Sequence, residues 1–518
     1  MQTLAPTAPP SPEAVPARPA RFPLARIGPV LCWAGPALLS VFIFSYQAAR
    51  PGPWRDELAT WSAATRTVPQ IWALGQHIDG VTVPYYLLVH VFAGWFGDSI
   101  LVLRVPSIIA MTGTVVVAAL LGRRLWGARA GLFAGLLLAV LPVSTRYAQE
   151  ARGYAFAALF ATCATLLLAA AQDRSRWWRW LAYGVSVLLL GWSHQIALLV
   201  LLGHAVAVLV VAGRRLLWWL LSVFVALAGV LPFALMGLGQ RGTQLDWLEA
   251  AKPADLADIV GNVFGYGILG GAVCVLAALA VRGQDGWALT VFLSAALPIG
   301  VLYTIDQLVT PMFVGRYLFF VAPLVCVLAG RALAAVSVPV ALGVIVVLGL
   351  IGLPQQEEFR RAHSGFDYRQ AAYQVSVNVQ PGDGLIYAPR GGWQFTDIAV
   401  RYYLGSAAPR DVLLRANEVQ NESLWSTECA DAGECLVGTD RVWTLSADNL
   451  ETGRRAGATD QLTFAEQQAL ALFDQVATVR VDGFTLAYFV RRPLVPVVEE
   501  PTSAYRHYGP GVAVSAGG

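Results

Sequence analysis

The chain alternates long apolar runs with short polar connections between residues 28 and 354. A helix needs about 20 mainly apolar residues to cross the hydrocarbon core of a bilayer. Runs of about this length predict eleven membrane-spanning helices, at 28–48, 101–122, 128–144, 153–171, 177–193, 195–212, 216–238, 259–281, 286–305, 314–330 and 332–354.

Two apolar stretches do not correspond to one crossing each. Residues 177–212 would be about 54 Å long as one helix, which is too long for a single span, so we expect a break at Ser193-His194-Gln195. Residues 84–97 are apolar but only fourteen residues long, a length typical of interfacial segments. We interpret them as a juxtamembrane helix on the outer surface, preceded by two surface helices near 57–65 and 70–77.

The arginines of the short connections support this count, because basic residues gather on the cytoplasmic side of a membrane protein. With a cytoplasmic N-terminus, the cytoplasmic connections contain Arg123, Arg124, Arg129, Arg174, Arg176, Arg179, Arg214, Arg215, Arg282 and Arg331. Counting 84–97 as a further span would move all of them outside. The pattern therefore predicts a multi-pass protein of the cytoplasmic membrane whose C-terminal region lies outside the cytoplasm.

Composition agrees with a membrane protein and divides the chain. Hydrophobic residues make up 56% of it and charged residues 13%, which excludes an ordinary soluble globular chain. Residues 1–27 are rich in Pro and Ala and predict a disordered cytoplasmic tail. After the helical polytopic domain of 28–354, alternating helix and strand patterns predict a small extracytoplasmic α/β domain over 355–495, followed by a flexible tail at 496–518.

The first candidate for chemistry is the acidic pair Asp56-Glu57, which follows the first predicted span between Trp54 and Trp61. One interpretation is structural, because an Asp N-cap and a first-turn Glu both stabilise the start of a helix. The other is catalytic, since a carboxylate at the mouth of a membrane bundle can deprotonate a hydroxyl and contribute roughly 10²–10⁴-fold in rate. Neighbouring helical residues point about 100° apart, so one carboxylate would be the base and the other an orienting or structural group.

A second polar cluster, around Glu150 and Arg152, lies where the third and fourth predicted spans meet, on the same side as Asp56. These two residues can simply form a local ion pair at headgroup level. Alternatively, Glu150 orients an acceptor or a neighbouring Arg, while Tyr147 and Tyr154 line a sugar site.

Further polar residues are expected on the outer side. His194 can be an interhelical hydrogen-bonding group or can act beside a phosphate. Arg316 can extend to the interface, or bind a phosphate together with Tyr317. Asp79 is assigned with Arg152 to substrate binding.

Cysteine and histidine spacing argues against a metal centre. Cys429 and Cys435 lie in the predicted outer domain, where oxidising conditions favour a disulfide over free thiols. No His, Cys and Asp spacing resembles a metal site, so the sequence requires no cofactor but leaves a divalent metal open. It also has no glycine-rich phosphate loop for a cytoplasmic nucleotide and nothing that indicates nucleic-acid binding.

Several motifs, taken in order, resemble those of the GT-C membrane glycosyltransferases. The similarity is to the family 39-like branch, which includes protein O-mannosyltransferases and aminoarabinose lipid A transferases, and above all to its bacterial predicted mannosyltransferases. The motifs are Trp54-x-Asp56-Glu57, Pro84-Tyr85-Tyr86, Arg104-Val105-Pro106-Ser107, Tyr147-Ala148-Gln149-Glu150-Ala151-Arg152-Gly153-Tyr154 and Gly315-Arg316-Tyr317.

This resemblance implies a polyprenyl-phosphate-linked sugar as donor, with mannose as the first expectation, and inverting transfer outside the cytoplasmic membrane. The acceptor would be a hydroxyl on an envelope protein, glycolipid or polysaccharide. Asp56 matches the family's catalytic base, and Glu150 falls where relatives carry a second essential acid. Arg316-Tyr317 matches the position that holds the donor phosphate, and His194 falls where aminoarabinose transferases place a phosphate-binding Lys.

Two other classes of function fit a protein of this kind: a flippase or transporter of lipid-linked sugars, and a non-catalytic envelope scaffold. Transporters place polar groups and broken helices near the middle of the bilayer. In this sequence most charges fall at the outer rim and only His204 is clearly deep. The distribution favours the enzyme.

Overall fold

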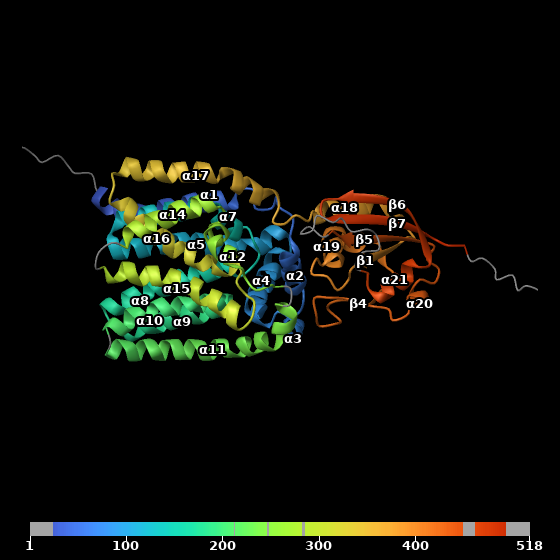
Figure 1. The fold of residues 1–518 in the computed structure, drawn as a ribbon, viewed down its shortest axis with the longest axis horizontal. Helices are drawn as coiled ribbons and strands as arrows, with labels where there is room; N and C mark the ends of the chain where they lie inside the picture. Colours follow the sequence, from blue (N-terminus) through green and yellow to red (C-terminus); the bar gives the residue numbers. More distant parts are fainter. Residues whose placement is uncertain (1–23, 212, 246–247, 282–284, 449–461, 494–518) are drawn as a thin grey trace, which may run out of the picture.

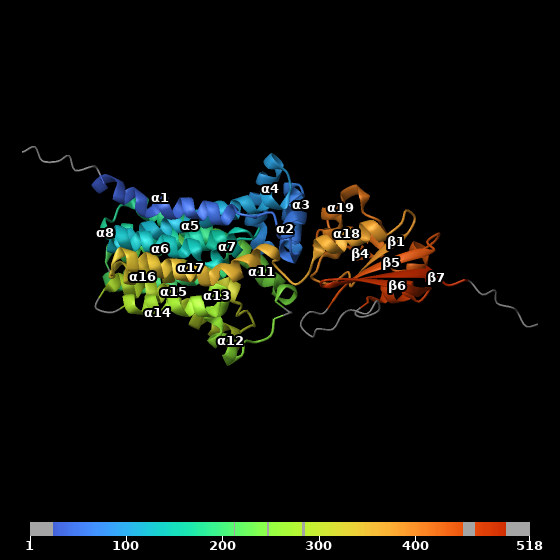
Figure 2. The same ribbon diagram turned by 90° about the horizontal axis from the view of Figure 1, so that it is seen from above.

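The computed structural model describes residues 24–211, 213–245, 248–281, 285–448 and 462–493. Most of the predicted N-terminal tail, the predicted C-terminal tail and Arg282 lie outside these ranges. The described chain forms a helical bundle joined end-on to a smaller domain that contains a β-sheet (Figures 1 and 2).

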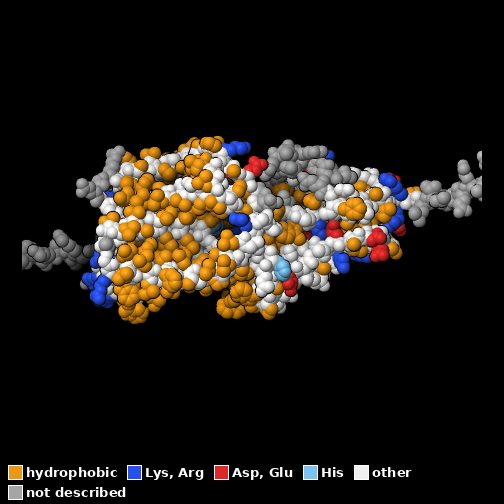
Figure 3. Space-filling view, turned by 60° about the horizontal axis from the view of Figure 1, so that its bottom comes forward, with side chains coloured by type: hydrophobic (Ala, Val, Ile, Leu, Met, Phe, Trp, Pro, Cys, Tyr) orange, Lys and Arg blue, Asp and Glu red, His pale blue; other side chains and the backbone are white. Residues whose placement is uncertain are grey.

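Long helices run side by side along the bundle (Figure 1). Hydrophobic side chains cover its flank, as expected for a surface that faces lipid (Figure 3). The helices are α1 (Leu24–Ser45), α5 (Ile100–Trp126), α6 (Ala128–Val140), α8 (Tyr154–Asp173), α9 (Trp177–Ser193), α10 (Leu201–Val211), α11 (Arg214–Gln244), α14 (Gly267–Ala280), α15 (Gly286–Leu308), α16 (Ala322–Ala334) and α17 (Val338–Arg361).

The predicted count of eleven spans is confirmed only in part. Among the described residues, six helices are long and apolar enough to cross a membrane, or up to seven if the bent pair of α6 and α7 (Pro142–Ala148) is one span. Other predicted spans correspond to shorter apolar segments, namely Val30–Ser45, Gln195–Val211 and Gly267–Ala280. At 1.5 Å per residue such segments reach roughly 21–26 Å, less than the ~30 Å of a typical hydrocarbon core.

Small residues let the central helices approach closely. A Cβ added to Gly131 of α6 would lie 2.3 Å from the Ala119 carbonyl oxygen of α5. One added to Gly330 of α16 would lie 2.6 Å from the Ala130 carbonyl oxygen. Close backbone approach of this kind is how helices associate where no water is expelled between them.

Two breaks bring polar residues to the end of the bundle that faces the smaller domain. Helix α7 is bent by 68° from α6 at Pro142, and the polar segment 149–153 follows it. Helix α9 ends at Ser193 and the 3-10 helix η2 (Gln195–Val200) begins two residues later, so the predicted break is confirmed.

Short helices cover this end of the bundle (Figures 1 and 2). The surface helices predicted near 57–65, 70–77 and 84–97 are all present. Together with later short elements, they are α2 (Arg55–Ala64), α3 (Val68–His77), η1 (Gly80–Thr82), α4 (Val83–Phe96), α12 (Pro253–Ala257), α13 (Ile259–Phe264) and η3 (Gly315–Val321).

The C-terminal domain has a five-stranded mixed sheet in the order β2-β1-β5-β7-β6. Strand β1 (Gly384–Ala388) runs parallel to β2 (Arg410–Asp411) and β5 (Arg441–Ala447), and β7 (Phe484–Arg491) runs antiparallel to β5 and β6 (Phe473–Val481). The remaining elements are α18 (Tyr368–Asn378), α19 (Thr396–Leu404), η4 (Gly405–Ala407), β3 (Leu414–Ala416), β4 (Thr427–Glu428), α20 (Ala432–Cys435) and α21 (Phe464–Leu470).

The C-terminal domain rests directly on α2. Ser62 Oγ donates to Glu418 Oε1 at 3.1 Å, and Arg66 Nη2 donates to the Ser423 carbonyl at 2.6 Å. Glu418 is fully buried and also pairs with Arg401. The helix that carries the acidic pair is therefore held between the bundle and the C-terminal domain.

Candidate active site

The acidic pair lies in the first turn of α2, where its two carboxylates have different surroundings. The N-cap residue is Trp54, and no side chain caps the helix, so the interpretation of Asp56 as an N-cap is wrong. The Asp56 side chain is 17% exposed, with Arg55 Nε at 3.5 Å and Arg152 Nε at 4.0 Å from its oxygens. Asp56 is thus the member of the pair that keeps access to solvent.

Glu57 is fully buried and serves as an anchor. Its Oε1 accepts hydrogen bonds from Arg104 Nε and Ala151 N, both at 2.8 Å, and its Oε2 accepts one from Arg104 Nη2 at 2.6 Å. Burial alone would raise the pKa of Glu57, but the charge and hydrogen bonds of Arg104, followed by those of His363, hold it well below its usual range. A carboxylate held in this way is a poor proton acceptor.

The bond from Ala151 to Glu57 shows that the two acidic clusters meet at one end of the bundle. Glu150 is 2% exposed, and its Oε2 lies 3.4 Å from Arg146 Nη2. Burial raises the pKa of Glu150 to about 7, against the opposing charge of Arg146. Glu150 therefore lies close to the acidic pair but, unlike Asp56, is buried.

Arg152 links Asp56 to Asp79 through a chain of polar contacts. Arg152 Nη1 donates to the Tyr86 hydroxyl at 3.4 Å, and this hydroxyl donates to Asp79 Oδ2 at 2.5 Å. Gln244 Nε2 of α11 donates to Asp79 Oδ1 at 2.7 Å. Asp79 has a left-handed backbone (φ +57°), which strains a residue other than glycine and is held here by these bonds.

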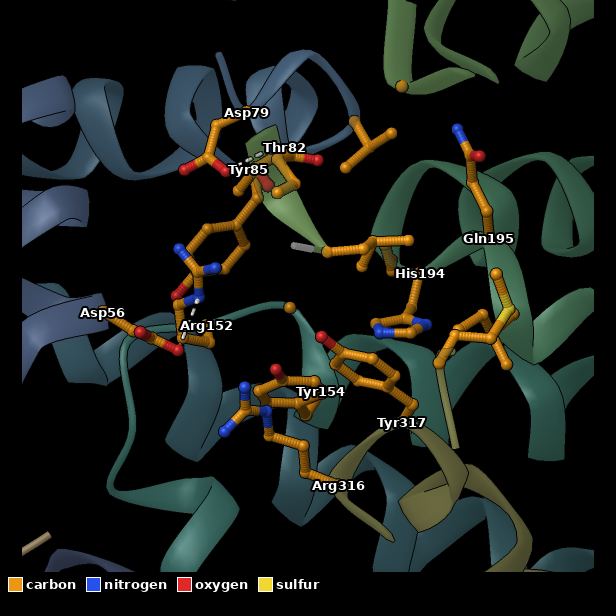
Figure 4. A pocket seen from close by; sticks show the side chains of 18 of the residues that line it. Asp56, Asp79, Thr82, Tyr85, Arg152, Tyr154, His194, Gln195, Arg316 and Tyr317 are labelled. Carbon is orange, nitrogen blue, oxygen red and sulfur yellow. Dashed lines mark hydrogen bonds and ion pairs between the residues drawn. The ribbon is translucent and has the colours of Figure 1, made fainter. Parts of the chain in front are cut away.

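Aromatic and basic side chains face this chain of contacts (Figure 4). The ring of His194 lies 5.1 Å from that of Tyr317 and 5.6 Å from that of Tyr154, measured between centroids. The guanidinium of Arg316 lies 5.5 Å from the centre of the Tyr317 ring. Gly315 makes this position possible, because a Cβ there would lie 2.5 Å from the Cβ of Asn262.

His194 is a neutral group in this environment. Burial, together with the neighbouring charges of Arg152 and Arg316, lowers the pKa of His194 to about 4. Among the described residues its Nδ1 has no hydrogen-bond partner, although the atom is buried. The side chain is therefore suited to a neutral hydrogen bond with a ligand.

These groups surround one cavity of about 320 Å³. Seven of the ten residues that the sequence assigned to catalysis, donor binding or substrate binding line it: Asp56, Asp79, Arg152, Tyr154, His194, Arg316 and Tyr317. Glu57, Glu150 and Tyr147 are not among the lining residues. Tyr147 instead packs its ring 4.2 Å from Phe319 and 5.3 Å from Tyr154.

Sequence reasoning missed other residues of the lining. Arg55 and Tyr85 lie inside motifs that were recognised, but no role was assigned to them. Trp393 also lines the cavity, although it belongs to the C-terminal domain. No local signal in the sequence distinguishes Trp393, because only folding brings it to the bundle.

The described residues contain no group of three or more His, Cys, Asp or Glu side chains arranged to hold a metal ion. In the C-terminal domain, Cys429 and Cys435 form a disulfide across a short loop.

The comparisons with known proteins concern both sequence and fold. Residues 82–236 match the profile of the family described as dolichyl-phosphate-mannose-protein mannosyltransferase. This range includes Glu150, Arg152 and His194, whereas Asp56 and Arg316 lie outside it. Among proteins with curated descriptions, none matches the sequence.

Three solved structures show the relation in fold. ArnT from Cupriavidus metallidurans in the apo state has a TM-score of 0.59 at 14% identity, over 90% of this chain and 98% of that one. The same protein bound to undecaprenyl phosphate has a TM-score of 0.58 at 14% identity, over 89% and 98%. The apo oligosaccharyltransferase of Archaeoglobus fulgidus has a TM-score of 0.51 at 10% identity, over 92% and 76%. The match of residues 82–236 confirms the resemblance of this part of the chain to the protein mannosyltransferase family, and the three structures show that the chain shares their fold.

Proposed function

We propose that this protein transfers a sugar, mannose in the first instance, from a polyprenyl-phosphate donor to a hydroxyl acceptor outside the cytoplasmic membrane. The observation that carries the proposal is the cavity at the end of the bundle. It combines one partly exposed carboxylate, Asp56, with the basic and aromatic wall formed by Arg316, Tyr317 and His194.

In the proposed reaction Asp56 is the general base. It takes the proton of the acceptor hydroxyl as that oxygen attacks the anomeric carbon of the sugar. The bond between this carbon and the phosphate oxygen breaks, and its electron pair leaves with the polyprenyl phosphate. Attack from the side opposite the leaving phosphate inverts the configuration of the anomeric carbon.

Arg316, Tyr317 and His194 stabilise the departing phosphate. A guanidinium offers a planar fork of donors to phosphate oxygens, and fixed donors are most effective where charge develops during the reaction. His194 is neutral near pH 7, so it donates a hydrogen bond rather than a charge. The structure of the similar ArnT bound to undecaprenyl phosphate supports a lipid phosphate as the ligand.

Glu57 and Arg152 position the base. Glu57 fixes the backbone of Ala151, next to Arg152, and Arg152 faces Asp56 at 4.0 Å. Glu150 does not line the cavity, but it is buried near the acidic pair, where it can orient Arg146. The family match over residues 82–236 supports mannose as the first sugar to test.

The orientation in the membrane is part of the proposal. Basic side chains gather at the end of the bundle away from the C-terminal domain (Figure 3), which favours a cytoplasmic location of that end. In intact cells, a membrane-impermeant maleimide should label S376C on α18, and it should label R176C only after the cells are permeabilised. The reverse pattern would contradict the proposed sidedness.

The activity test uses purified protein in lipid nanodiscs with labelled polyprenyl-phosphomannose and envelope acceptors. Asp56→Asn should lower the transfer rate by roughly 10²–10⁴-fold while leaving donor binding in place. Asp258→Asn, which changes an exposed carboxylate away from the cavity lining, is the matched control. If Asp56→Asn retained activity within a few-fold of wild type, Asp56 would not be the general base. Translocation of the donor across the membrane of sealed proteoliposomes, without transfer, would identify a flippase instead.

A further inference from the structure

The C-terminal domain contributes one aromatic side chain, Trp393, to the lining of the cavity. We propose that Trp393 is a stacking platform for a sugar ring of the acceptor, so that the acceptor is a saccharide rather than a polypeptide. This inference rests on the proposed transferase function and names the class of its second substrate.

The segment that carries Trp393 is held in a fixed shape. Trp393 packs edge to face on Trp425, with their ring centroids 4.8 Å apart. Trp425 Nε1 donates to the Gly392 carbonyl at 3.1 Å. Phe395 has a left-handed backbone (φ +49°), and its ring lies 5.8 Å from that of Trp425. Strained backbone in residues other than glycine persists where the surrounding structure enforces it, and such strain is concentrated at ligand sites.

An ionic cluster anchors the start of the same segment. The Arg390 side chain is 3% exposed and lies 2.6 Å from Asp411 Oδ1 and 3.1 Å from Glu428 Oε1. Its backbone N–H donates to Glu466 Oε1 at 3.1 Å. Burying a long charged side chain costs desolvation free energy, which the ion pairs of Arg390 offset. These pairs therefore fix the segment. The side chain of Trp393 is therefore presented in one place.

The position of Trp393 indicates which substrate it meets. The polyprenyl chain of a donor must lie along the helices of the bundle, whereas the C-terminal domain lies beyond their ends (Figures 1 and 2). A side chain of that domain therefore faces the aqueous end of the cavity, from which the acceptor enters.

The chemistry of the lining favours a saccharide. The flat ring of Trp393 lines the same cavity as hydrogen-bonding groups that include Asp56, Thr82 and Gln195. A sugar ring presents C–H groups on its faces and hydroxyls around its edge, which match an aromatic face and a polar rim respectively. One recurring mode of peptide recognition adds an extended strand to the edge of a sheet, and none of the described lining residues belongs to a strand.

The test uses the full-length protein in nanodiscs with three acceptor probes: methyl α-mannoside, a linear mannotriose and a Ser/Thr-containing peptide. For the saccharides, Trp393→Ala should raise the acceptor KM about tenfold, the order of an aromatic stacking contact, with kcat and donor KM within threefold of wild type. Trp393→Phe should restore most of the loss. Trp95→Ala removes an exposed tryptophan that does not line the cavity and should change nothing.

An unchanged saccharide KM in Trp393→Ala, or transfer to the peptide alone, would overturn the inference while leaving the transferase function intact. If Trp393→Ala does not fold, Trp393→Phe and Trp393→Leu provide the same comparison of a ring with an aliphatic side chain. If no donor turns over, the proposed function fails, and saturation-transfer NMR with mannotriose then tests only whether Trp393 binds a saccharide. Binding that is lost in Trp393→Leu would support the stacking role, and no binding to wild type would overturn it.

Discussion

Glu57 and Arg104 form a fully buried pair in which Arg104 donates through Nε at 2.8 Å and through Nη2 at 2.6 Å. Arg104 also donates through Nη1 to the carbonyls of Ala48 and Pro51, at 2.8 and 2.9 Å. A single ion pair therefore ties the start of α2 to α5 and to the turn after α1. This ion pair fixes the conformation of the acidic motif.

Glu57→Gln should destabilise the protein by about 3–5 kcal/mol, because it leaves the Arg104 charge buried without its counterion. Thermal unfolding in nanodiscs measures the loss. Glu357→Gln, in an exposed pair with Arg50, is the control and should change little. In wild type the folded-state pKa of Glu57 lies below its unfolded value, so its stabilising contribution is present above about pH 4.5 and is lost as the pH falls. A Glu57→Gln variant as stable as wild type would argue against the anchoring role.

Glu150 should make stability fall as the pH rises. Its folded-state pKa is raised to about 7 by burial, so the folded state binds more protons than the unfolded state above about pH 4.5. The contribution is fully present below that pH and is lost as the pH rises through about 7, by roughly 3 kcal/mol. Unfolding temperatures of wild type and Glu150→Gln between pH 5 and 8 should diverge on the alkaline side, with the variant less dependent on pH. Parallel curves would contradict this prediction.

Arg316→Lys should weaken donor binding, since a lysine keeps the charge but loses the bidentate fork. Hydrogen bonds to charged groups contribute about 1.5–3 kcal/mol, so the donor KM should rise by roughly 10-fold to 100-fold. Steady-state kinetics with varied donor concentration measures the effect. Arg415→Lys on the exposed strand β3 is the matched control. A rise in the acceptor KM alone would show that Arg316 binds the acceptor rather than the donor, and would contradict the prediction.

Loss of the disulfide between Cys429 and Cys435 should destabilise the C-terminal domain modestly. The closed loop is short, with a sequence separation of 6, so the chain-entropy contribution is about 2 kcal/mol. Protease resistance of the C-terminal domain, compared between wild type and Cys429→Ser/Cys435→Ser with and without reductant, reports the effect. The reductant should affect only wild type, because the double variant has no bridge to lose.

Local patterns in the sequence predicted much of the helical architecture. The break at Ser193-His194-Gln195 follows from helix length, and α2, α3 and α4 follow from short runs at interfacial length. The number of crossings was harder to predict. Hydropathy alone does not show that a helix such as α14 is too short to cross the membrane. The C-terminal domain was expected to alternate helices and strands, but the antiparallel addition of β6 and β7 to a parallel sheet depends on long-range pairing.

The candidate site shows the same division. The sequence by itself determined which groups were available for chemistry, because carboxylates and arginines beside apolar runs are costly to keep unless they are paired or used. Only the tertiary structure decided their roles. It buried Glu57 against Arg104, left Asp56 open to the cavity, and brought Trp393 to the lining from a domain more than 300 residues further along the chain. Burial and charge pairing arise from contacts between distant segments, and no local pattern encodes them.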